Sequence, residues 1–449
     1  MAENEKQFTC SWIFDTLVVL CDGNVVCGCA DPYGERPLGH LKENTLYEIW
    51  NSEKVQVIRE DLNNGFSPFC LDCGLKQFVG DTREIPQRPV EVETLSSLFL
   101  ENCVGCNISC FKSVCNQESG IIGTRSKKMM SLDEFKSAMD QVGEKLSRLQ
   151  FFNYGEPFVH PRAVEMLEHA KLEYPHVYIY VSTNGLLITE DKMRRLIDAG
   201  VDEITFSVDG PDQETYVKYR QKGDFDKVFD IMRIFVKKRN RLGKEYPLIN
   251  WRYILFKWND SETQMNKARR LARKIGVDKL VWEITDHPEE AKSEKYQIGT
   301  PAWEKIYHEI WDTSHFASAI KSRRYRAKIK VLTKRIDVEA GKPFEIKVRA
   351  KNVGSSQWQR AALGWLRTVR LGGQLCDRNK NVIDRDFARE FIPRDTPSGR
   401  SFEMEIEIPP IEQPGEYLIE FDMVSEGMDW FKNLGSKVAW KKIKVVQRD

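Results

Sequence analysis

The sequence lacks the segments that would direct a chain into or across a membrane. The first residues, MAENEKQFTCSW, contain no basic stretch followed by an apolar run, and no run of about 18 apolar residues occurs elsewhere. An excess of charge of one sign is also missing, because 68 Lys and Arg balance 67 Asp and Glu. Without a strong field, no nucleic acid partner is expected. We therefore expect a cytoplasmic protein with no membrane span.

Cysteine, in contrast, is abundant and unevenly distributed. The chain has 11 cysteines, and only Cys376 stands apart from two groups. The first group consists of Cys10, Cys21, Cys27, Cys29, Cys70 and Cys73, and the second of Cys103, Cys106, Cys110 and Cys115. Because the cytosol keeps thiols reduced, metal or redox chemistry explains these groups better than disulfides do.

The central part of the chain alternates between two kinds of segment. Short apolar runs, typical of strands, lie at 95–100, 149–154, 177–185, 203–210, 249–256 and 279–285. Amphipathic helical patterns lie between them at 163–174, 191–200, 226–240 and 264–276. Strands separated by helices predict an α/β fold with a parallel sheet, whose ligands bind at the carboxyl ends of the strands.

Two changes of pattern predict three domains in the 449 residues. A polar, proline-containing stretch near residue 90 separates the first cysteine group from the alternating segments. Beyond about residue 328 the apolar period becomes two, which predicts an antiparallel, Ig-like β-sandwich. We therefore predict domains at 1–90, 91–328, including a helical connector from 287, and 329–449.

The second cysteine group lies in one loop, after the first strand of the central part. Three thiolates from a short loop can hold three irons of a [4Fe–4S] cluster and leave the fourth iron open. A closed zinc site of four cysteines is the alternative. The segment CNISC, from Cys106 to Cys110, resembles the CxxxCxxC loop of the radical S-adenosylmethionine (SAM) superfamily. Ser113 stands where that loop has its third cysteine, so Cys115 is the expected third ligand and Cys103 the alternative.

Motifs at the ends of later strands extend this resemblance. The segments NYGEP, STNG, SVDG and YRQKGDF follow the loop in the order of the superfamily's SAM-binding segments. The resemblance implies SAM contacts from Tyr154, Gly155, Glu156, Ser182, Asn184, Ser207, Asp209 and Arg220. It also implies a partial (βα)6 barrel and an enzyme that cleaves SAM reductively to a 5′-deoxyadenosyl radical. An electron donor such as flavodoxin or ferredoxin is then an expected partner.

The first cysteine group resembles a SPASM or twitch domain, which carries an auxiliary iron–sulfur cluster. The resemblance rests on DGNVVCGC, LYEIWNS and the terminal CxxC, although such a domain normally follows the barrel. It implies a second [4Fe–4S] cluster on Cys10, Cys70, Cys73 and either Cys27 or Cys29. We favour Cys29 because a short hairpin would present Cys27 on its opposite face. A zinc ribbon on the same residues is the alternative.

The substrate is the least constrained part of this interpretation. The predicted sandwich resembles modules of bacterial glycan-modifying proteins, and four of its aromatic residues are candidate sugar-stacking platforms: Trp358, Trp365, Trp430 and Phe431. The same aromatics can instead fill the sandwich core. A saccharide or glycan precursor is therefore the expected substrate, with a peptide or protein, suggested by the SPASM resemblance, as the alternative. A zinc-stabilised binding scaffold is the non-enzymatic alternative.

Overall fold

The fold is known from a computed structural model. It describes residues 7–28, 31–78, 85, 87–93, 95–113, 119–285, 287–297, 300–306, 309, 325–334, 336–354, 358–360, 368–426, 429–433 and 435–447. The chain divides into two compact units. The first comprises Met1–Val277 with Thr285–Ser293, and the second comprises Asp278–Ile284 with Glu294–Asp449. None of the helices in the described ranges combines the length and apolar character needed to cross a bilayer.

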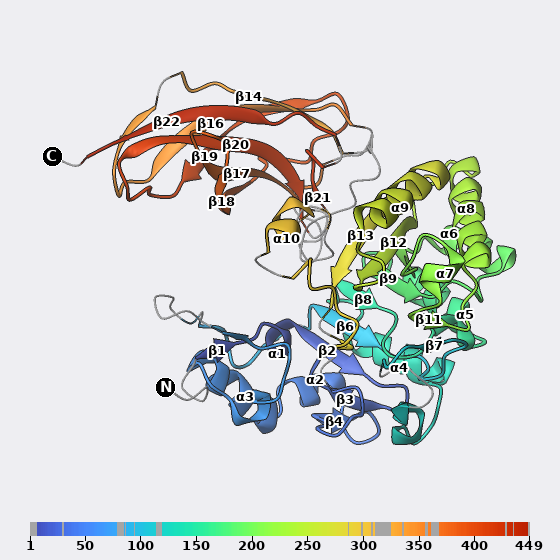
Figure 1. Ribbon diagram of the computed structural model, residues 1–449. Helices are drawn as coiled ribbons and strands as arrows, with labels where there is room; N and C mark the ends of the chain where they lie inside the picture. Colours follow the sequence, from blue (N-terminus) through green and yellow to red (C-terminus); the bar gives the residue numbers. More distant parts are fainter. Residues whose placement is uncertain are drawn as a thin grey trace. The chain divides into compact units, whose positions relative to one another are not determined.

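The first unit is built on one large sheet (Figure 1). The strands that the first unit contributes to this sheet are β2 (Thr16–Val19), β3 (Asn24–Val26), β4 (Gly39–His40), β6 (Ser97–Leu100), β8 (Arg148–Gln150), β9 (Tyr178–Thr183), β10 (Glu203–Ser207) and β12 (Leu248–Leu255). Neighbouring strands follow the order β12-β10-β9-β8-β6-β2-β3-β4. All pairs from β12 to β2 are parallel. The predicted α/β class with a parallel sheet is thus confirmed.

Helices connect these strands and pack beside one another in chain order (Figure 1). They are α1 (Trp12–Asp15), α2 (Leu46–Trp50), α3 (Glu53–Asn63), α4 (Leu132–Val142), α5 (Ala163–Glu173), α6 (Glu190–Ala199), α7 (Gln213–Tyr216), α8 (Phe225–Arg241) and α9 (Glu262–Ile275). Local sequence sets their ends. Thr189 caps the first turn of α6, and Gly200 ends that helix at a φ of +78°, a conformation that favours glycine.

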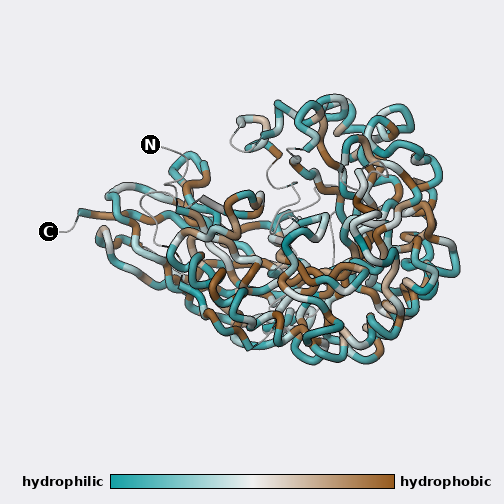
Figure 2. Tube along the Cα trace, turned by 90° about the horizontal axis from the view of Figure 1, so that it is seen from below, coloured by the Kyte–Doolittle hydropathy of each residue, from teal (hydrophilic) through white to brown (hydrophobic). Residues whose placement is uncertain are grey.

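Hydrophobic burial explains why the central strands are continuous apolar runs. Every residue of β9 and β10 is buried, as expected for parallel strands covered on both faces. Figure 2 shows the same pattern along the tube, with brown hydrophobic stretches alternating with teal turns. The carboxyl ends of these strands carry the polar motifs that the sequence singled out.

The N-terminal cysteine segment joins the barrel sheet directly. Strand β2 pairs in parallel with β6, and the register aligns Val18 with Phe99. A small core of Val18, Leu20, Val26 and Phe99 seals this junction. Two further short pairs complete the unit: β1 (Phe8–Thr9) with β5 (Gln77–Phe78), and β7 (Ser109–Cys110) with β11 (Arg220–Gln221). A module that precedes the barrel in sequence therefore extends the barrel sheet at its first strand.

The second unit contains two sheets around a shared hydrophobic core. Before them come β13 (Lys279–Ile284) and α10 (Pro301–Ile306). One sheet has the order β14 (Ala327–Val331), β16 (Phe344–Asn352), β19 (Ser401–Ile408). The other has the order β15 (Asp337–Glu339), β22 (Ala439–Val446), β20 (Gly415–Ser425), β17 (Val369–Asp377), β18 (Val382–Phe391), with β21 (Asp429–Trp430) beside β20. Except for the parallel pair β15–β22, the recorded pairings in these sheets are antiparallel.

The aromatic residues expected as sugar platforms are buried in this unit. Trp358 and Phe431 are 0 % exposed and Trp430 is 2 % exposed, and the Trp358 and Phe431 rings pack edge to face. The platform interpretation is wrong for these three residues, because their rings are buried, and those of Trp358 and Phe431 belong to the core between the sheets. Trp365 lies outside the described residues.

Candidate functional site

The second cysteine group lies in the loop that follows β6, at the carboxyl end of the strand. Cys110 lies on β7, and the antiparallel pair β7–β11 aligns Cys110 with Arg220. This pairing attaches the cysteine loop to the segment YRQKGDF, which is 110 residues further along the chain. Phe111 adds a backbone hydrogen bond to the carbonyl of Tyr219 at 2.8 Å. The loop is thus held by backbone contacts before any cluster binds.

A buried ion pair fixes Arg220 beside the loop. Its Nε donates to Oδ2 of Asp209 at 2.5 Å, and its Nη1 donates to the Cys110 sulfur at 3.5 Å. The other oxygen of Asp209 accepts the backbone N–H of Ile254 at 2.7 Å. Although burial alone would lower it, the pKa of Arg220 lies well above its usual value because of Asp209 and Cys110. A permanent cation therefore stands next to one predicted cluster ligand.

The NYGEP segment packs tightly against the same loop. The N–H of Glu156 donates to the carbonyl of Gly105 at 2.9 Å. A Cβ atom added at Gly155 would lie 2.0 Å from the carbonyl oxygen of Cys103. Only glycine permits this approach of two backbones.

The carboxylate of Glu156 is used inside the protein. It accepts hydrogen bonds from the Thr183 hydroxyl at 2.6 Å and from the N–H of Asn184 at 2.7 Å. Burial raises the pKa of Glu156, and these hydrogen bonds oppose the rise. The side chain thereby connects NYGEP to STNG, and its predicted contact with SAM stays a prediction. Tyr154, the preceding residue, is partly buried.

STNG reaches the cysteine loop through an amide. The Nδ2 group of Asn184 donates to Oδ1 of Asn107 at 2.9 Å and to the Cys106 sulfur at 3.7 Å. The hydroxyls of Ser182 and Ser207 lie 3.4 Å apart on adjacent strands, and Arg252 donates to Ser207 at 2.8 Å. All eight predicted SAM-contacting residues thus lie at one edge of the sheet, and three of the four motifs contact the cysteine loop directly.

Cys103, the alternative third ligand, has a hydrogen-bond partner within the protein. Its thiol donates to the backbone carbonyl of Glu156 at 3.1 Å, and the residue is 1 % exposed. Burial raises the pKa of Cys103 to about 12 and that of Cys106 to about 11. Such thiols bind iron as thiolates, so cluster assembly releases their protons. Cys115 lies outside the described residues.

The first cysteine group surrounds a cavity. Cys10, Cys27, Cys70 and Cys73 line it together with Arg36. No three Cys, His, Asp or Glu side chains in the described ranges are arranged to hold a single metal ion. A cubane cluster takes one thiolate at each of four irons, so four thiols around a cavity fit a [4Fe–4S] group.

The expectation that Cys27 faces away from this group is wrong. Strand β3 ends at Val26, and Gly28 adopts a φ of +68°, so the alternation of faces along a strand stops before Cys27. Cys29, the favoured fourth ligand, lies outside the described residues. Cys21 is separate from the cavity, and its thiol donates to the carbonyl of Lys127 at 3.3 Å.

The cavity-lining cysteines of the first group and the described cysteines of the second group lie at opposite edges of the sheet. Strand β3 runs antiparallel to β2, and their register aligns Val26 with Val18, so Cys27 follows β3 at the amino end of β2. Because β2 and β6 are parallel, this is also the amino end of β6. The second group follows the carboxyl end of β6.

Comparison with known families identifies both groups. Residues 101–249 match the radical SAM superfamily, and residues 10–74 match SPASM, an iron–sulfur cluster-binding domain. The chain thus contains a radical SAM domain and a SPASM domain. Its domains are those that bind [4Fe–4S] clusters and SAM, and the matches overturn the zinc-scaffold alternative.

The curated relatives resemble only part of this chain. A tungsten-containing aldehyde ferredoxin oxidoreductase cofactor-modifying protein from Pyrococcus furiosus is 26 % identical over 231 residues, 50 % of this chain and 61 % of that protein. Mycofactocin maturase MftC from Mycolicibacterium smegmatis is 29 % identical over 29 % of this chain and 31 % of its own length. The chain thus spans less than two thirds of these relatives. Streptococcus suis SuiB bound to precursor peptide SuiA aligns over 56 % of this chain and 58 % of that one, at 13 % identity and a TM-score of 0.35.

Sequence reasoning missed several polar residues behind the radical SAM site. Glu101, Arg125 and Asn153 form a buried network at the carboxyl end of β6. A buried Glu at a strand end and an Arg after the cysteine loop are the only sequence signals, and neither is specific. Their contacts required the fold.

Proposed function

We propose that the protein cleaves SAM reductively at a [4Fe–4S] cluster held by Cys106, Cys110 and Cys115. The observation that carries this proposal is that side chains of two predicted SAM motifs donate N–H groups to two of these sulfurs. Asn184 of STNG donates to Cys106, and Arg220 of YRQKGDF donates to Cys110. N–H donors to the sulfurs of a cluster help to set its potential and orientation.

The chain's own residues would orient SAM and shield the reaction. With cluster and SAM bound, one electron from a donor such as flavodoxin or ferredoxin would release methionine and a 5′-deoxyadenosyl radical, which takes a hydrogen atom from the substrate. We expect the polar groups of SAM to contact the hydroxyls of Ser182 and Ser207 and the backbone of Tyr154 to Glu156. Asp209 keeps Arg220 in place. The buried strands would exclude water from the radical.

We propose that the auxiliary [4Fe–4S] cluster has Cys10, Cys27, Cys70 and Cys73 as ligands. Cys29 is the competing fourth ligand. The position of these thiols at the amino edge of the sheet favours electron transfer or stabilisation over contact with SAM at the opposite edge.

Single replacements by alanine test this ligand set. Cys27→Ala is expected to lose the auxiliary cluster, about four of about eight irons per chain, whereas Cys29→Ala keeps it. Cys21→Ala is the control, because Cys21 is a buried thiol of the same N-terminal segment that does not line the cavity. Iron analysis and EPR of the reduced protein would show the difference, and loss of the cluster in Cys29→Ala alone would refute the assignment.

For the substrate, we propose a peptide or protein side chain. MftC, a relative of the radical SAM domain, is named as a maturase of mycofactocin. The saccharide hypothesis loses most of its support, because three of the four aromatic residues that suggested it, Trp358, Trp430 and Phe431, are buried. We keep the division into 1–90, 91–328 and 329–449 as the proposed domain arrangement, and a reducing, cytoplasmic setting as the one that suits eleven cysteines.

Anaerobic reconstitution followed by dithionite and SAM tests the proposed function. The protein should form 5′-deoxyadenosine, and Cys106→Ala should abolish it. Cys115→Ala should abolish it as well. Survival of cleavage in Cys115→Ala would exclude Cys115 as the third ligand, and absence of cleavage in the fully reconstituted wild type would refute the function.

A further inference from the structure

Glu101 and Arg125 form a fully buried ion pair beside the radical SAM site. Both side chains are 0 % exposed, and Nε of Arg125 donates to Oε1 of Glu101 at 2.8 Å. The Nη2 group of Arg125 adds a second contact to Oε2 of Glu101 at 3.2 Å. Burial alone would lower the pKa of Arg125, but Glu101 raises it above its ordinary value. The pair therefore stays charged.

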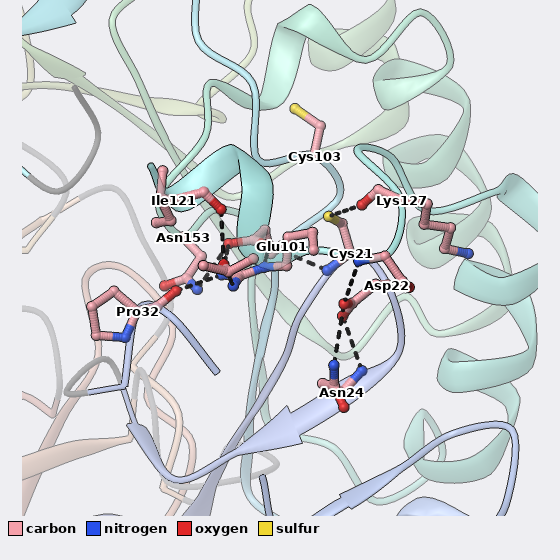
Figure 3. Close-up of polar contacts among 12 residues, drawn as sticks. Cys21, Asp22, Asn24, Pro32, Glu101, Cys103, Ile121, Lys127 and Asn153 are labelled. Atoms are coloured by element: carbon pink, nitrogen blue, oxygen red, sulfur yellow. Dashed lines mark hydrogen bonds and ion pairs between the residues drawn. The ribbon is translucent and has the colours of Figure 1, made fainter. Parts of the chain in front are cut away.

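The pair holds together segments that are distant in sequence (Figure 3). Glu101 ends the run that leads from β6 into the cysteine loop, and it accepts hydrogen bonds from the N–H of Cys21 at 3.3 Å and from Nδ2 of Asn153 at 3.2 Å. Arg125 donates to the carbonyl of Pro32 at 2.7 Å. Asn153 is the first residue of NYGEP. The Glu101 carboxylate, at the start of the cysteine loop, thus contacts both NYGEP and the SPASM segment.

Figure 3 also shows how Cys103 of the loop lies relative to this network. The Cys103 side chain points away from Glu101, and its sulfur contacts the carbonyl of Glu156 instead. The hydrogen bonds of the network therefore constrain the backbone positions of the cysteine loop and NYGEP. Arg125 lies beyond the loop, so the pair holds the chain both before and after the cluster-binding residues.

We propose that Glu101 and Arg125 are positioning residues for SAM binding. Their hydrogen bonds hold NYGEP and the SPASM segment, at Cys21 and Pro32, in fixed positions relative to the cluster loop. This inference rests on the proposed function. Stability alone does not explain the pair, because a buried ion pair can often be replaced by apolar residues at little cost in stability. Its geometry explains it better, since fixed hydrogen bonds to three segments define their relative positions.

The test is a double replacement that removes both charges, Glu101→Met with Arg125→Met. The matched control is Lys171→Met with Asp202→Asn, which removes another ion pair of the same unit whose side chains are 10 % and 5 % exposed. Asp202 directly precedes β10, so the control lies at the amino edge of the sheet, away from NYGEP. Both proteins are reconstituted as full-length chains, and iron, SAM-dependent EPR shifts and 5′-deoxyadenosine formation are measured.

We expect the double variant to keep the iron content of the wild type and to lose about 10- to 100-fold in 5′-deoxyadenosine formation, mostly through a raised KM for SAM. The change that SAM causes in the EPR signal should become smaller. A merely structural role would lower iron content and Tm while each remaining cluster responds to SAM normally, and that result would overturn the proposal. So would cleavage equal to the control.

A single replacement covers the case in which the double variant does not fold. Asn153→Ala leaves the ion pair intact and removes only its contact with NYGEP, so it should raise the KM for SAM in the same direction. An unchanged KM there would overturn the inference. Failure of the proposed function has a different signature, because the wild type itself would then neither cleave SAM nor respond to it in EPR.

Discussion

Replacing Gly155 by alanine should disrupt SAM cleavage more than any other change of one methyl group. The added Cβ would lie 2.0 Å from the carbonyl oxygen of Cys103, and real Cβ contacts do not come closer than 3.0 Å. The obstacle is backbone, so no side-chain rotation relieves it. NYGEP and the cysteine loop must therefore separate by about 1 Å, and a misplacement of this size near a reacting group costs about 100-fold in rate.

A neighbouring glycine supplies the control for this experiment. A Cβ added at Gly105, also in the cysteine loop, would meet its nearest neighbour, a methyl of Val159, at an ordinary 3.9 Å. Formation of 5′-deoxyadenosine is measured for Gly155→Ala and Gly105→Ala after equal iron loading. We expect about a 100-fold loss for the first and little change for the second. Wild-type cleavage by Gly155→Ala would refute the idea that this close approach sets the site.

Two further predictions concern buried charges. Asp209→Asn keeps an acceptor for the N–H of Ile254 but leaves Arg220, whose side chain is 12 % exposed, without its counter-charge. It should lower the free energy of unfolding by about 3–5 kcal/mol in denaturant titrations. Asp230→Asn, which breaks the exposed ion pair of Asp230 with Arg233, should cost under about 1 kcal/mol, and equal effects would contradict this. In the second unit, burial raises the pKa of Asp422 to about 8. The folded state then binds a proton that the unfolded state releases near pH 4, so stability should fall with rising pH between about 4 and 8, by up to about 1.4 kcal/mol per unit. Asp422→Asn should flatten this slope, and an unchanged slope in unfolding titrations would assign it to another group.

The chemistry of the central site could be read from the sequence because it depends on short motifs at strand ends. Apolar runs located the strands, and the strands placed NYGEP, STNG and SVDG at one edge of a parallel sheet. The resemblance to radical SAM enzymes then supplied the roles. What the motifs could not reveal is how their side chains are used: Glu156 contacts STNG rather than open space.

The N-terminal module shows where sequence reasoning stops. Its apolar strand 16–19 is a recognisable strand, but no local pattern says that it pairs with β6 of the barrel. The expectation that Cys27 faces away from the other cysteines failed for a related reason. The alternation of side-chain faces does not continue past Val26, because the strand ends there and Gly28 turns the chain.

The pairing of β2 with β6 brings the N-terminal module next to the Glu101–Arg125 network. The SPASM cavity lies at the amino edge of the sheet and the SAM motifs lie at the carboxyl edge, where residues of the N-terminal module contact the Glu101–Arg125 pair. The backbone N–H of Cys21 donates to Glu101, and the backbone carbonyl of Pro32 accepts from Arg125. Backbone contacts of this kind place no demand on the side chains of the hairpin. The requirement falls on the two charged residues, which connect the two modules beside the SAM motifs in addition to the pairing of β2 with β6.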